Sequence, residues 1–148
     1  MKPAIFVVNH QDRVVVDPGM VERWQGRGVE AALRIARDHL LCDRETWDAL
    51  MEVDVALVDD ETSDRVHREF MNIPGATDVI TFDHGEIVIG LEVARRQACE
   101  HGEPEEREVF RYLVHGLLHL AGYEDEEAED RRRMESIQEA LVAMLWTT

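Results

Sequence analysis

Hydrophobic and polar positions along the chain predict four short strands. The first is the β-branched and aromatic run AIFVV at 4–8, and the second is VDVALV at 53–58, which ends at a group of acids. Two further runs, DVITF at 78–82 and EIVI at 86–89, are separated only by Asp-His-Gly, a short link typical of a β-hairpin. Together the four runs predict a small mixed sheet.

Apolar residues at helical spacing predict the remaining elements. From 29 to 40, apolar positions recur every three or four residues, with arginines on the other face. An earlier short helix is predicted around Trp24, broken near Gly26 and Gly28. Ser63 is expected to cap the helix that follows it. Three later helices are expected at about 91–100, 105–121 and 127–145.

Length and element order predict the fold class. The chain has 148 residues, enough for one domain, 1–148, with a sizeable core. Strands and helices alternate early and the end is helical, which favours an α/β sandwich. We therefore expect a small, about four-stranded mixed sheet covered by about five helices. Hydrophobic residues make up 45% of the chain and charged residues 32%, as in folded proteins.

Neither a membrane span nor a disulfide framework is predicted. No apolar run approaches the roughly 20 residues that cross a bilayer, and the amino end does not read as a secretory signal. Cys42 and Cys99 have no CxxC spacing and are expected to be small, partly buried side chains in a reducing compartment. A cytoplasmic location is therefore expected.

Net charge narrows the classes of partner. The chain carries a formal charge of −16 at pH 7. Broad, non-specific nucleic-acid binding depends on Lys and Arg neutralising phosphates, so this balance argues against it. The acidity is also an objection to any RNA-directed function, and a local basic groove would be needed to answer it.

One predicted helix carries an unusual polar stripe. Segment 107–121 is apolar nearly all round, as expected of a helix at the centre of a domain. Within it Glu108, Arg111, His115 and His119 recur at spacings of three and four. Unpaired buried polar groups are costly, so this stripe must face a cleft, a ligand or compensating partners. Histidines one turn apart are also within joint reach of one metal ion.

The residues after this helix supply a third candidate ligand. Gly122 allows a left-handed turn, so the acids that follow can swing back toward the two rings. Asp125 lies six residues after His119, far enough for its carboxylate to return. Three protein ligands and an open position are typical of a catalytic metal site. The sequence thus predicts one Zn²⁺ per chain, or another divalent transition metal, held by His115, His119 and Asp125.

The segment HGLLHLAGYED at 115–125 closely resembles the signature of the YbeY family of metal-dependent endoribonucleases, which mature bacterial ribosomal RNA. The family pattern is His-Gly-x-Leu-His-Leu-x-Gly-Tyr-Asp-His. TDVITF at 77–82 and GEIVIG at 85–90 resemble the family's Thr-Asp-Val-Leu-Ser-Phe and Gly-Asp-Ile-x-Ile-Ser. ALVDDE at 56–61 and MESIQEAL at 134–141 fit as well, so the resemblance runs in order from about residue 53 to the end.

Two departures from the family pattern bear on the site. The family's third histidine falls on Asp125, a legitimate zinc ligand whose charge would make the metal a weaker Lewis acid and raise the pKa of bound water. The same charge would widen tolerance for harder ions such as manganese. Counting back from Thr77, the family's asparagine falls on His67 and its arginine on Met71. Arg68 is the candidate replacement for that arginine, with a plain surface position as the alternative.

The resemblance implies a single-strand-directed endoribonuclease that acts in ribosomal RNA processing and maturation, with the small ribosomal subunit as a partner. A metal-bound water would be the nucleophile. Arg68, or another arginine, would stabilise the charge that develops on phosphorus.

Two alternatives remain open. HxxxHxxGxxD is also the ligand spacing of a zinc-peptidase class in which a glutamate after the first histidine is the general base. Gly116 occupies that place here, so a base would have to come from elsewhere, such as Glu86 or Glu124. The other alternative is a relative without turnover that binds a metal for structure or binds the ribosome. The changes at Asp125 and Met71 keep this alternative open.

Other polar residues receive modest roles. His84, beside the hairpin, is expected in an exposed turn. Thr77 and Asp78 are expected either to shape the strand edge beside the metal or to cap the strand. Surface positions are expected for the histidines without partner spacing: His10, His39 and His101.

Overall fold

Four strands form one sheet: β1 (Ala4–Asn9), β2 (Glu52–Val58), β3 (Val79–Phe82) and β4 (Glu86–Gly90). Their order in this computed structural model, which describes residues 3–147, is β1-β2-β4-β3. The pairs β1–β2 and β2–β4 are parallel, and β3 runs antiparallel to β4 at the edge. The hairpin between them turns at Gly85, whose N–H donates to the carbonyl of Phe82 at 2.9 Å. The predicted small, mixed, four-stranded sheet is confirmed.

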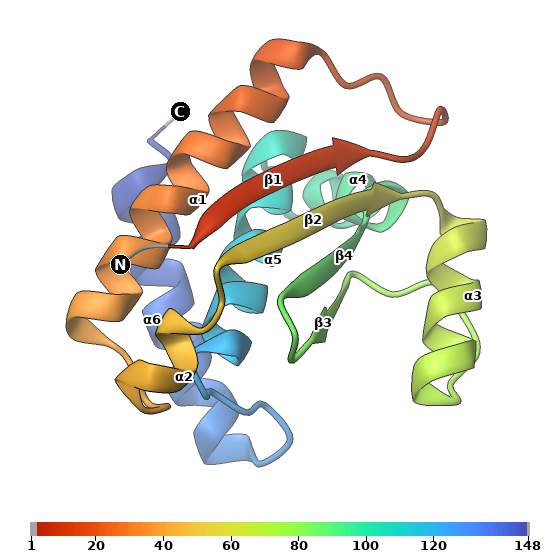
Figure 1. The fold of residues 1–148 in the computed structure, drawn as a ribbon. Helices are drawn as coiled ribbons and strands as arrows, with labels where there is room; N and C mark the ends of the chain where they lie inside the picture. Colours follow the sequence, from red (N-terminus) through yellow and green to blue (C-terminus); the bar gives the residue numbers. More distant parts are fainter. Residues whose placement is uncertain (1–2, 148) are drawn as a thin grey trace.

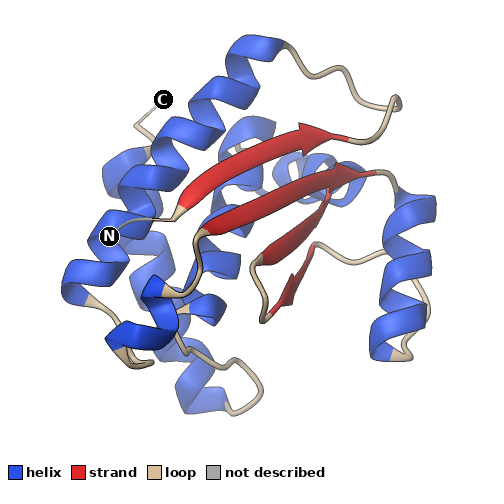
Figure 2. Cartoon of the chain, viewed as in Figure 1, coloured by secondary structure: helices blue, strands red, loops and turns tan. Residues whose placement is uncertain are grey.

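Six helices are present in the described residues: α1 (Pro18–Asp38), α2 (Arg44–Asp48), α3 (Asp60–Met71), α4 (Leu91–His101), α5 (Glu105–Leu120) and α6 (Ala128–Leu145). In Figure 1, α3 stands at one side of the sheet, away from α1, α2 and α6. Figure 2 shows the same grouping by type of element, with long helices packed behind and beside the sheet. The α/β class predicted from the sequence is therefore correct.

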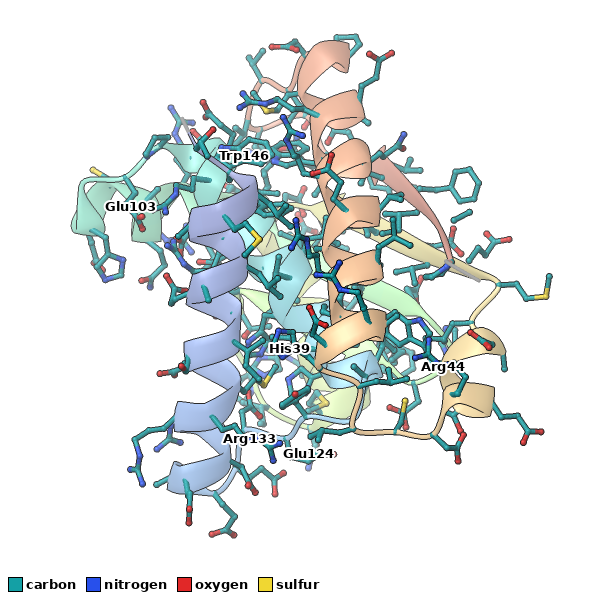
Figure 3. All side chains as sticks on the ribbon, turned by 90° about the vertical axis from the view of Figure 1, so that its left-hand side faces the viewer. His39, Arg44, Glu103, Glu124, Arg133 and Trp146 are labelled. Carbon is teal, nitrogen blue, oxygen red and sulfur yellow. The ribbon has the colours of Figure 1, made fainter. Side chains whose placement is uncertain are left out.

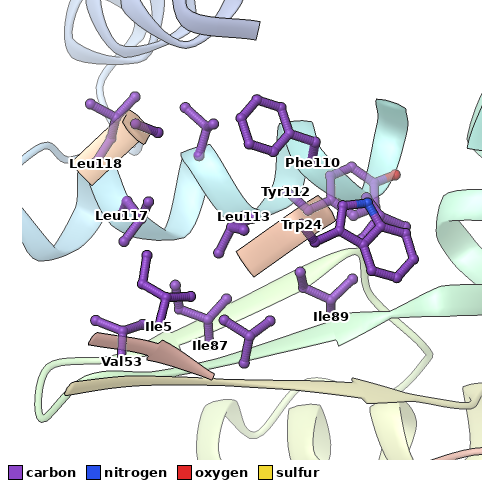
Figure 4. Close-up of a cluster of buried hydrophobic side chains, with 14 of the residues drawn as sticks. Ile5, Trp24, Val53, Ile87, Ile89, Phe110, Tyr112, Leu113, Leu117 and Leu118 are labelled. Atoms are coloured by element: carbon purple, nitrogen blue, oxygen red, sulfur yellow. The ribbon is translucent and has the colours of Figure 1, made fainter. Parts of the chain in front are cut away.

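Helix α5 forms the centre of the core. Figure 4 shows it lying across the sheet, with Leu113 and Leu117 facing the strands. Val53 and Ile87, which point toward it, are fully buried at 0% exposed. Helix α5 comes close to β4 at Gly116, where an added Cβ would stand 2.6 Å from Cδ1 of Ile87. A side chain at that position would force Ile87 or the helix to move.

Helix α1 is continuous, which corrects the prediction of a break near Gly26 and Gly28. It runs from Pro18, behind the side-chain cap Asp17, to Asp38. An added Cβ on Gly28 would stand 3.0 Å from Leu113 and 3.3 Å from Ile5. The glycine is thus where α1 packs closely on β1 and α5, and this tertiary packing outweighs the low helix propensity of glycine.

The residue that caps α3 is Asp59, not Ser63. The Asp59 carboxylate accepts the N–H of Thr62 at 2.9 Å, so the helix begins one turn earlier than predicted. Ser63 is instead buried within the first turn, and its hydroxyl donates to the carbonyl of Thr77 at 3.0 Å. The Thr77 N–H donates back to the same hydroxyl at 2.9 Å, which ties α3 to the chain before β3.

The short helix α2 was not predicted. Asp43 caps it by accepting the N–H of Thr46 at 2.7 Å, and its one buried residue is Trp47. Of the two cysteines, Cys42 is half-buried just before this helix, whereas Cys99 is exposed on α4 rather than partly buried as expected.

Helix α6 closes the domain on the far side of α5. Figure 3 shows it with Trp146 at one end and Arg133 near the other. The Trp146 ring stacks on Phe110 with centroids 5.1 Å apart, which fixes the end of α6 to α5. In the described part of the chain, no helix is both long enough and apolar enough to cross a membrane.

Candidate metal centre

Two histidines project from one face of the last turns of α5. His115 and His119 lie one helical turn apart. Their rings are perpendicular, with centroids 4.6 Å apart and an interplanar angle of 86°. Both side chains are mostly buried, at 21% and 24% exposed, so their ring nitrogens need partners.

The chain reverses direction directly after α5. Gly122 has a φ of +109°, a conformation that favours glycine, and its N–H donates to the carbonyl of His119 at 3.0 Å. An added Cβ here would also stand 2.9 Å from the backbone nitrogen of Cys42. Gly122 therefore lets the chain pass close to the segment after α1 and return Asp125 to the histidines, as the sequence predicted.

Three ligand-type atoms form a small triangle at this place. The two Nε2 atoms of His115 and His119 are 3.1 Å apart. Oδ2 of Asp125 lies 3.3 Å from Nε2 of His115 and 3.5 Å from Nε2 of His119. The sequence prediction that these three side chains converge is thus correct as geometry.

The other nitrogen of each ring faces an oxygen acceptor. Nδ1 of His119 lies 2.9 Å from the carbonyl oxygen of Tyr123, and Nδ1 of His115 lies 2.8 Å from Oε1 of Gln138. In a neutral imidazole one nitrogen donates and the other accepts. These contacts place the proton on Nδ1 in both rings, so both Nε2 lone pairs point toward each other and the Asp125 carboxylate. Three electron-rich atoms this close together need a positive charge between them, which either a proton on one imidazole or a bound metal ion can supply.

The triangle fits a tetrahedral metal ion. Bonds of about 2.0–2.1 Å to zinc, at tetrahedral angles, separate two ligand atoms by about 3.3 Å. The three separations in this structure, 3.1, 3.3 and 3.5 Å, bracket that value. Two imidazoles and a carboxylate are also a donor set that zinc and other first-row transition metals accept. The fourth position of such a site would be free of protein ligands.

A charged network adjoins the histidine pair. The Arg111 guanidinium donates to Glu103 at 2.8 Å and to Glu139 at 2.8 Å, and it also pairs with Glu108. Glu103 pairs in turn with Arg107. The polar stripe predicted on α5 is therefore satisfied partly by internal ion pairs and partly by the histidine site.

The network holds its members charged. Burial lowers the pKa of Arg111, but hydrogen bonds to Glu139 and Glu103 outweigh this effect and raise it above its usual value. The hydrogen bond from Arg111 is the main cause that lowers the pKa of Glu103 below 4.5. Burial raises the pKa of Glu139, but the bonds from Arg111 and Gln138 bring it below 4.5 overall. All three groups are thus ionised at neutral pH.

A cavity of about 270 Å³ opens beside His115. Residues from the β3 edge, α4, α5 and α6 surround it: Asp78, Val79, Gln97, Glu108, Arg111, Tyr112, His115, Glu135 and Gln138. Asp78 thus lies at the strand edge beside this cavity, and its carboxylate accepts the N–H of Val79 at 2.7 Å, while its role beside a metal stays a prediction.

Arg68 is not among the residues that line this cavity. It lies on α3, where its guanidinium donates to Asp64 at 3.2 Å and its side chain is 64% exposed. Its assignment to catalysis stays a prediction. Of the remaining histidines, His84 is exposed and stacks on Phe82 with centroids 5.8 Å apart. His10 and His101 are exposed as expected, and His39 is half-buried.

Sequence reasoning missed Gln138. Gln138 lies between Met134 and Leu141 on the buried side of α6, which otherwise forms an apolar stripe. A polar residue within that stripe was the available signal, because buried polar groups have partners.

Comparisons with known proteins place these features in a family. The family described as Endoribonuclease YbeY matches residues 9–145. A protein named Endoribonuclease YbeY from Heliobacterium modesticaldum is 30% identical over an alignment that covers 93% of both chains. Another of that name, from Acetivibrio thermocellus, is 28% identical and is covered to 96%. A longer one from Myxococcus xanthus is 38% identical, with 62% of this chain aligned to 36% of the relative.

One solved structure is similar across nearly the whole chain. The solution structure of TM1509 from Thermotoga maritima has a TM-score of 0.58 and 21% sequence identity. The match covers 96% of this chain and 89% of that one. At this level of identity the likeness establishes the fold alone.

Proposed function

The chain belongs to the endoribonuclease YbeY family, and from this membership we propose that it is a metal-dependent endoribonuclease that acts on single-stranded RNA in ribosomal RNA processing and maturation. The observation that carries the proposal is the triangle of Nε2, Nε2 and Oδ2 atoms, whose edges suit one tetrahedral cation. The proposed partners are ribosomal RNA and the small ribosomal subunit, in the cytoplasm.

In this proposal His115, His119 and Asp125 hold one divalent cation, Zn²⁺ or another transition metal. When bound, the cation supplies Lewis acidity toward a phosphate oxygen and lowers the pKa of a coordinated water. The two imidazoles fix the direction of binding, because each ring is held from behind through Nδ1. Asp125 contributes a negative charge, which weakens the Lewis acidity relative to three neutral histidines and favours harder ions such as manganese.

Arg68 is proposed to bind the phosphate next to the scissile bond and to stabilise the charge that develops there. Its present partner is Asp64, in a pair in which the Arg68 side chain is 64% exposed. Exposed ion pairs contribute little free energy, so a phosphate can replace the carboxylate at small cost. Guanidinium binds phosphate with two parallel hydrogen bonds, a geometry that lysine does not reproduce.

The acidic chain makes RNA binding selective rather than general. A net charge of −16 disfavours contact with arbitrary nucleic acid, which depends on phosphate neutralisation. A strand that reaches the site would be held by the cation and by few arginines. Substrate choice then rests on the ribosomal partner more than on the affinity of the isolated protein for RNA.

Packing at Gly116 argues against the peptidase alternative. In that class a glutamate follows the first histidine, whereas here the position faces Ile87 and an added Cβ would stand 2.6 Å from it. A glutamate there would force Ile87 or α5 to move. The non-enzymatic alternative, a metal-binding protein of the ribosome, is tested directly below.

The test uses a 5′-fluorescent single-stranded RNA and, in parallel, casein. The zinc-loaded protein is incubated with each, with and without a chelator, beside His119→Ala and the matched control His101→Ala, an exposed histidine on α4. We expect cleavage of the RNA alone, lost with chelator or with His119→Ala and kept with His101→Ala. Cleavage of neither substrate would favour the binding role, and cleavage of casein would overturn the proposal.

A further inference from the structure

Gln138 is a buried polar residue in the apolar stripe of α6. Its neighbours Met134, Leu141 and Val142 on the same face are buried, and Gln138 itself is 8% exposed. Both ends of its amide are engaged. Oε1 lies 2.8 Å from Nδ1 of His115, and Nε2 donates to Oε2 of Glu139 at 3.1 Å.

Glu139 sets the orientation of this amide. Oε2 of Glu139 also accepts the Nε–H of Arg111 at 2.8 Å. An ionised carboxylate only accepts hydrogen bonds, so Gln138 must turn its NH₂ group to Glu139 and its oxygen to His115. Arg111 and His115 lie on the same helix, and the three contacts therefore run from α5 to α6 and back.

We propose that Gln138, oriented by Glu139 and Arg111, is a positioning residue that keeps the proton of His115 on Nδ1 and leaves Nε2 free for a cation. The inference rests on the proposed metal function and adds a determinant outside the ligand set. A ligand histidine is commonly held in this way through its second nitrogen.

The two histidines differ in how they are held. Nδ1 of His119 donates to a backbone carbonyl, that of Tyr123, which no side-chain substitution removes. Nδ1 of His115 depends on one side chain. Without Gln138, the acceptor already in contact with His115 is Asp125, whose Oδ2 lies 3.3 Å from Nε2. The proton would then move to Nε2 and block the lone pair that binds the cation.

The first experiment measures the tautomers of metal-free, ¹⁵N-histidine-labelled protein by NMR in alkaline buffer, where imidazoles are neutral. In the wild type we expect the Nδ1–H form at both positions. In Gln138→Leu we expect His115 to change to the Nε2–H form and His119 to stay as it was. Zinc affinity, measured by chelator competition, should fall roughly 10-fold or more. Gln97→Leu removes another amide from the same cavity and should change neither quantity.

The second experiment removes the support rather than the amide. In Glu139→Ala, at an exposed position, the Gln138 amide is free to rotate and present NH₂ to His115, so the same change of tautomer should appear in part. Glu135→Ala removes an equal charge one turn earlier on α6 and measures the electrostatic effect alone. In the Gln138→Leu background, Glu139→Ala should have no further effect on zinc affinity beyond that of Glu135→Ala.

The outcomes separate this inference from the metal function. An unchanged His115 tautomer and unchanged zinc affinity in Gln138→Leu would overturn the positioning role. Wild-type protein that binds no zinc would overturn the metal function, while the tautomer measurement, which needs no metal, still decides the role of Gln138. If Gln138→Leu does not fold, Glu139→Ala decides it: a His115 tautomer identical to that in Glu135→Ala overturns the inference.

Discussion

The Nε2 atoms of His115 and His119 lie 3.1 Å apart, and the hydrogen bond that each ring makes through Nδ1 directs both lone pairs into the space between them. Such an arrangement is unfavourable unless a positive charge occupies that space. The carboxylate of Asp125 adds a negative charge at 3.3 and 3.5 Å from the same two atoms. The geometry thus indicates a cation site more strongly than the histidine spacing alone.

Zinc content tests the ligands directly. We expect about one equivalent per chain in the wild type and a loss of at least tenfold in affinity in His119→Ala and in Asp125→Ala, because two ligands bind a metal much less tightly than three. Elemental analysis after gel filtration measures the content. His101→Ala is the control for histidine loss. Full zinc occupancy in His119→Ala would remove the basis for the assigned ligands.

Replacing Asp125 by histidine restores the family pattern. The neutral ligand leaves more positive charge on the cation, so the acidic limb of the pH–rate profile for RNA cleavage should move down by about 1 pH unit. Preference for zinc over manganese should also increase, because imidazole is the softer ligand. Initial rates across pH, with each metal, provide the measurement. An unshifted limb in Asp125→His would show that the ligand charge does not govern the rate.

Arg68 is expected to act on the phosphate and not on the metal. Arg68→Gln should lower kcat by about 100-fold and leave the zinc content unchanged, because a lost contact to developing charge acts on the rate. Arg65→Gln, one turn earlier on α3, is the matched control and should cleave RNA normally. Equal activity of the two variants would show that Arg68 has no part in catalysis and only forms a surface ion pair with Asp64.

The space around two helical glycines predicts opposite effects of alanine substitution on the free energy of unfolding. Gly116→Ala should destabilise the protein by about 1–3 kcal/mol, because its Cβ would stand 2.6 Å from Ile87. Gly26→Ala, in the middle of α1 with nothing within 4 Å of the added Cβ, should stabilise it by about 0.5–1 kcal/mol. Denaturant unfolding followed by circular dichroism measures both. Similar midpoints for the two variants would contradict the packing described.

The lowered pKa of Glu103 predicts that part of the folding stability is lost at acid pH. Hydrogen bonding from Arg111 holds its pKa in the folded state below 4.5, so its contribution to stability is complete above that pH and is lost as the pH falls through the lower folded-state pKa. At neutral pH Glu103→Gln should cost roughly 1 kcal/mol, and the difference from wild type should shrink below about pH 4. Glu100→Gln, on the exposed end of α4, should cost nothing measurable at any pH. Urea midpoints at several pH values provide the comparison.

Much of this molecule follows from local sequence patterns, and what does not follow depends on contacts between distant segments. The strands were predicted within a residue or two, because their β-branched runs are bounded by acids and glycines. The break expected in α1 failed because Gly28 serves a tertiary contact with Ile5 and Leu113, which composition does not reveal. The cap of α3 was misplaced for a similar reason, since Ser63 is needed to hold the chain at Thr77.

The candidate site shows the same division. Spacing within 115–125 was enough to predict that two imidazoles and a carboxylate meet, because helix geometry and one glycine turn determine it. The contact of Gln138 with His115 could not be predicted, because Gln138 lies on another helix whose register against α5 is set by packing. Arg68 was chosen from a resemblance in sequence position, and α3 leaves it paired with Asp64.

All three donor atoms come from a single segment in which His115 and Asp125 are ten positions apart. A cross-link that closes so short a loop removes little conformational entropy from the unfolded chain. An ion held there would therefore secure the joint between α5 and α6 without holding the sheet together. Any effect of a bound ion on folding stability would then come from its affinity for the folded chain and not from cross-linking distant segments.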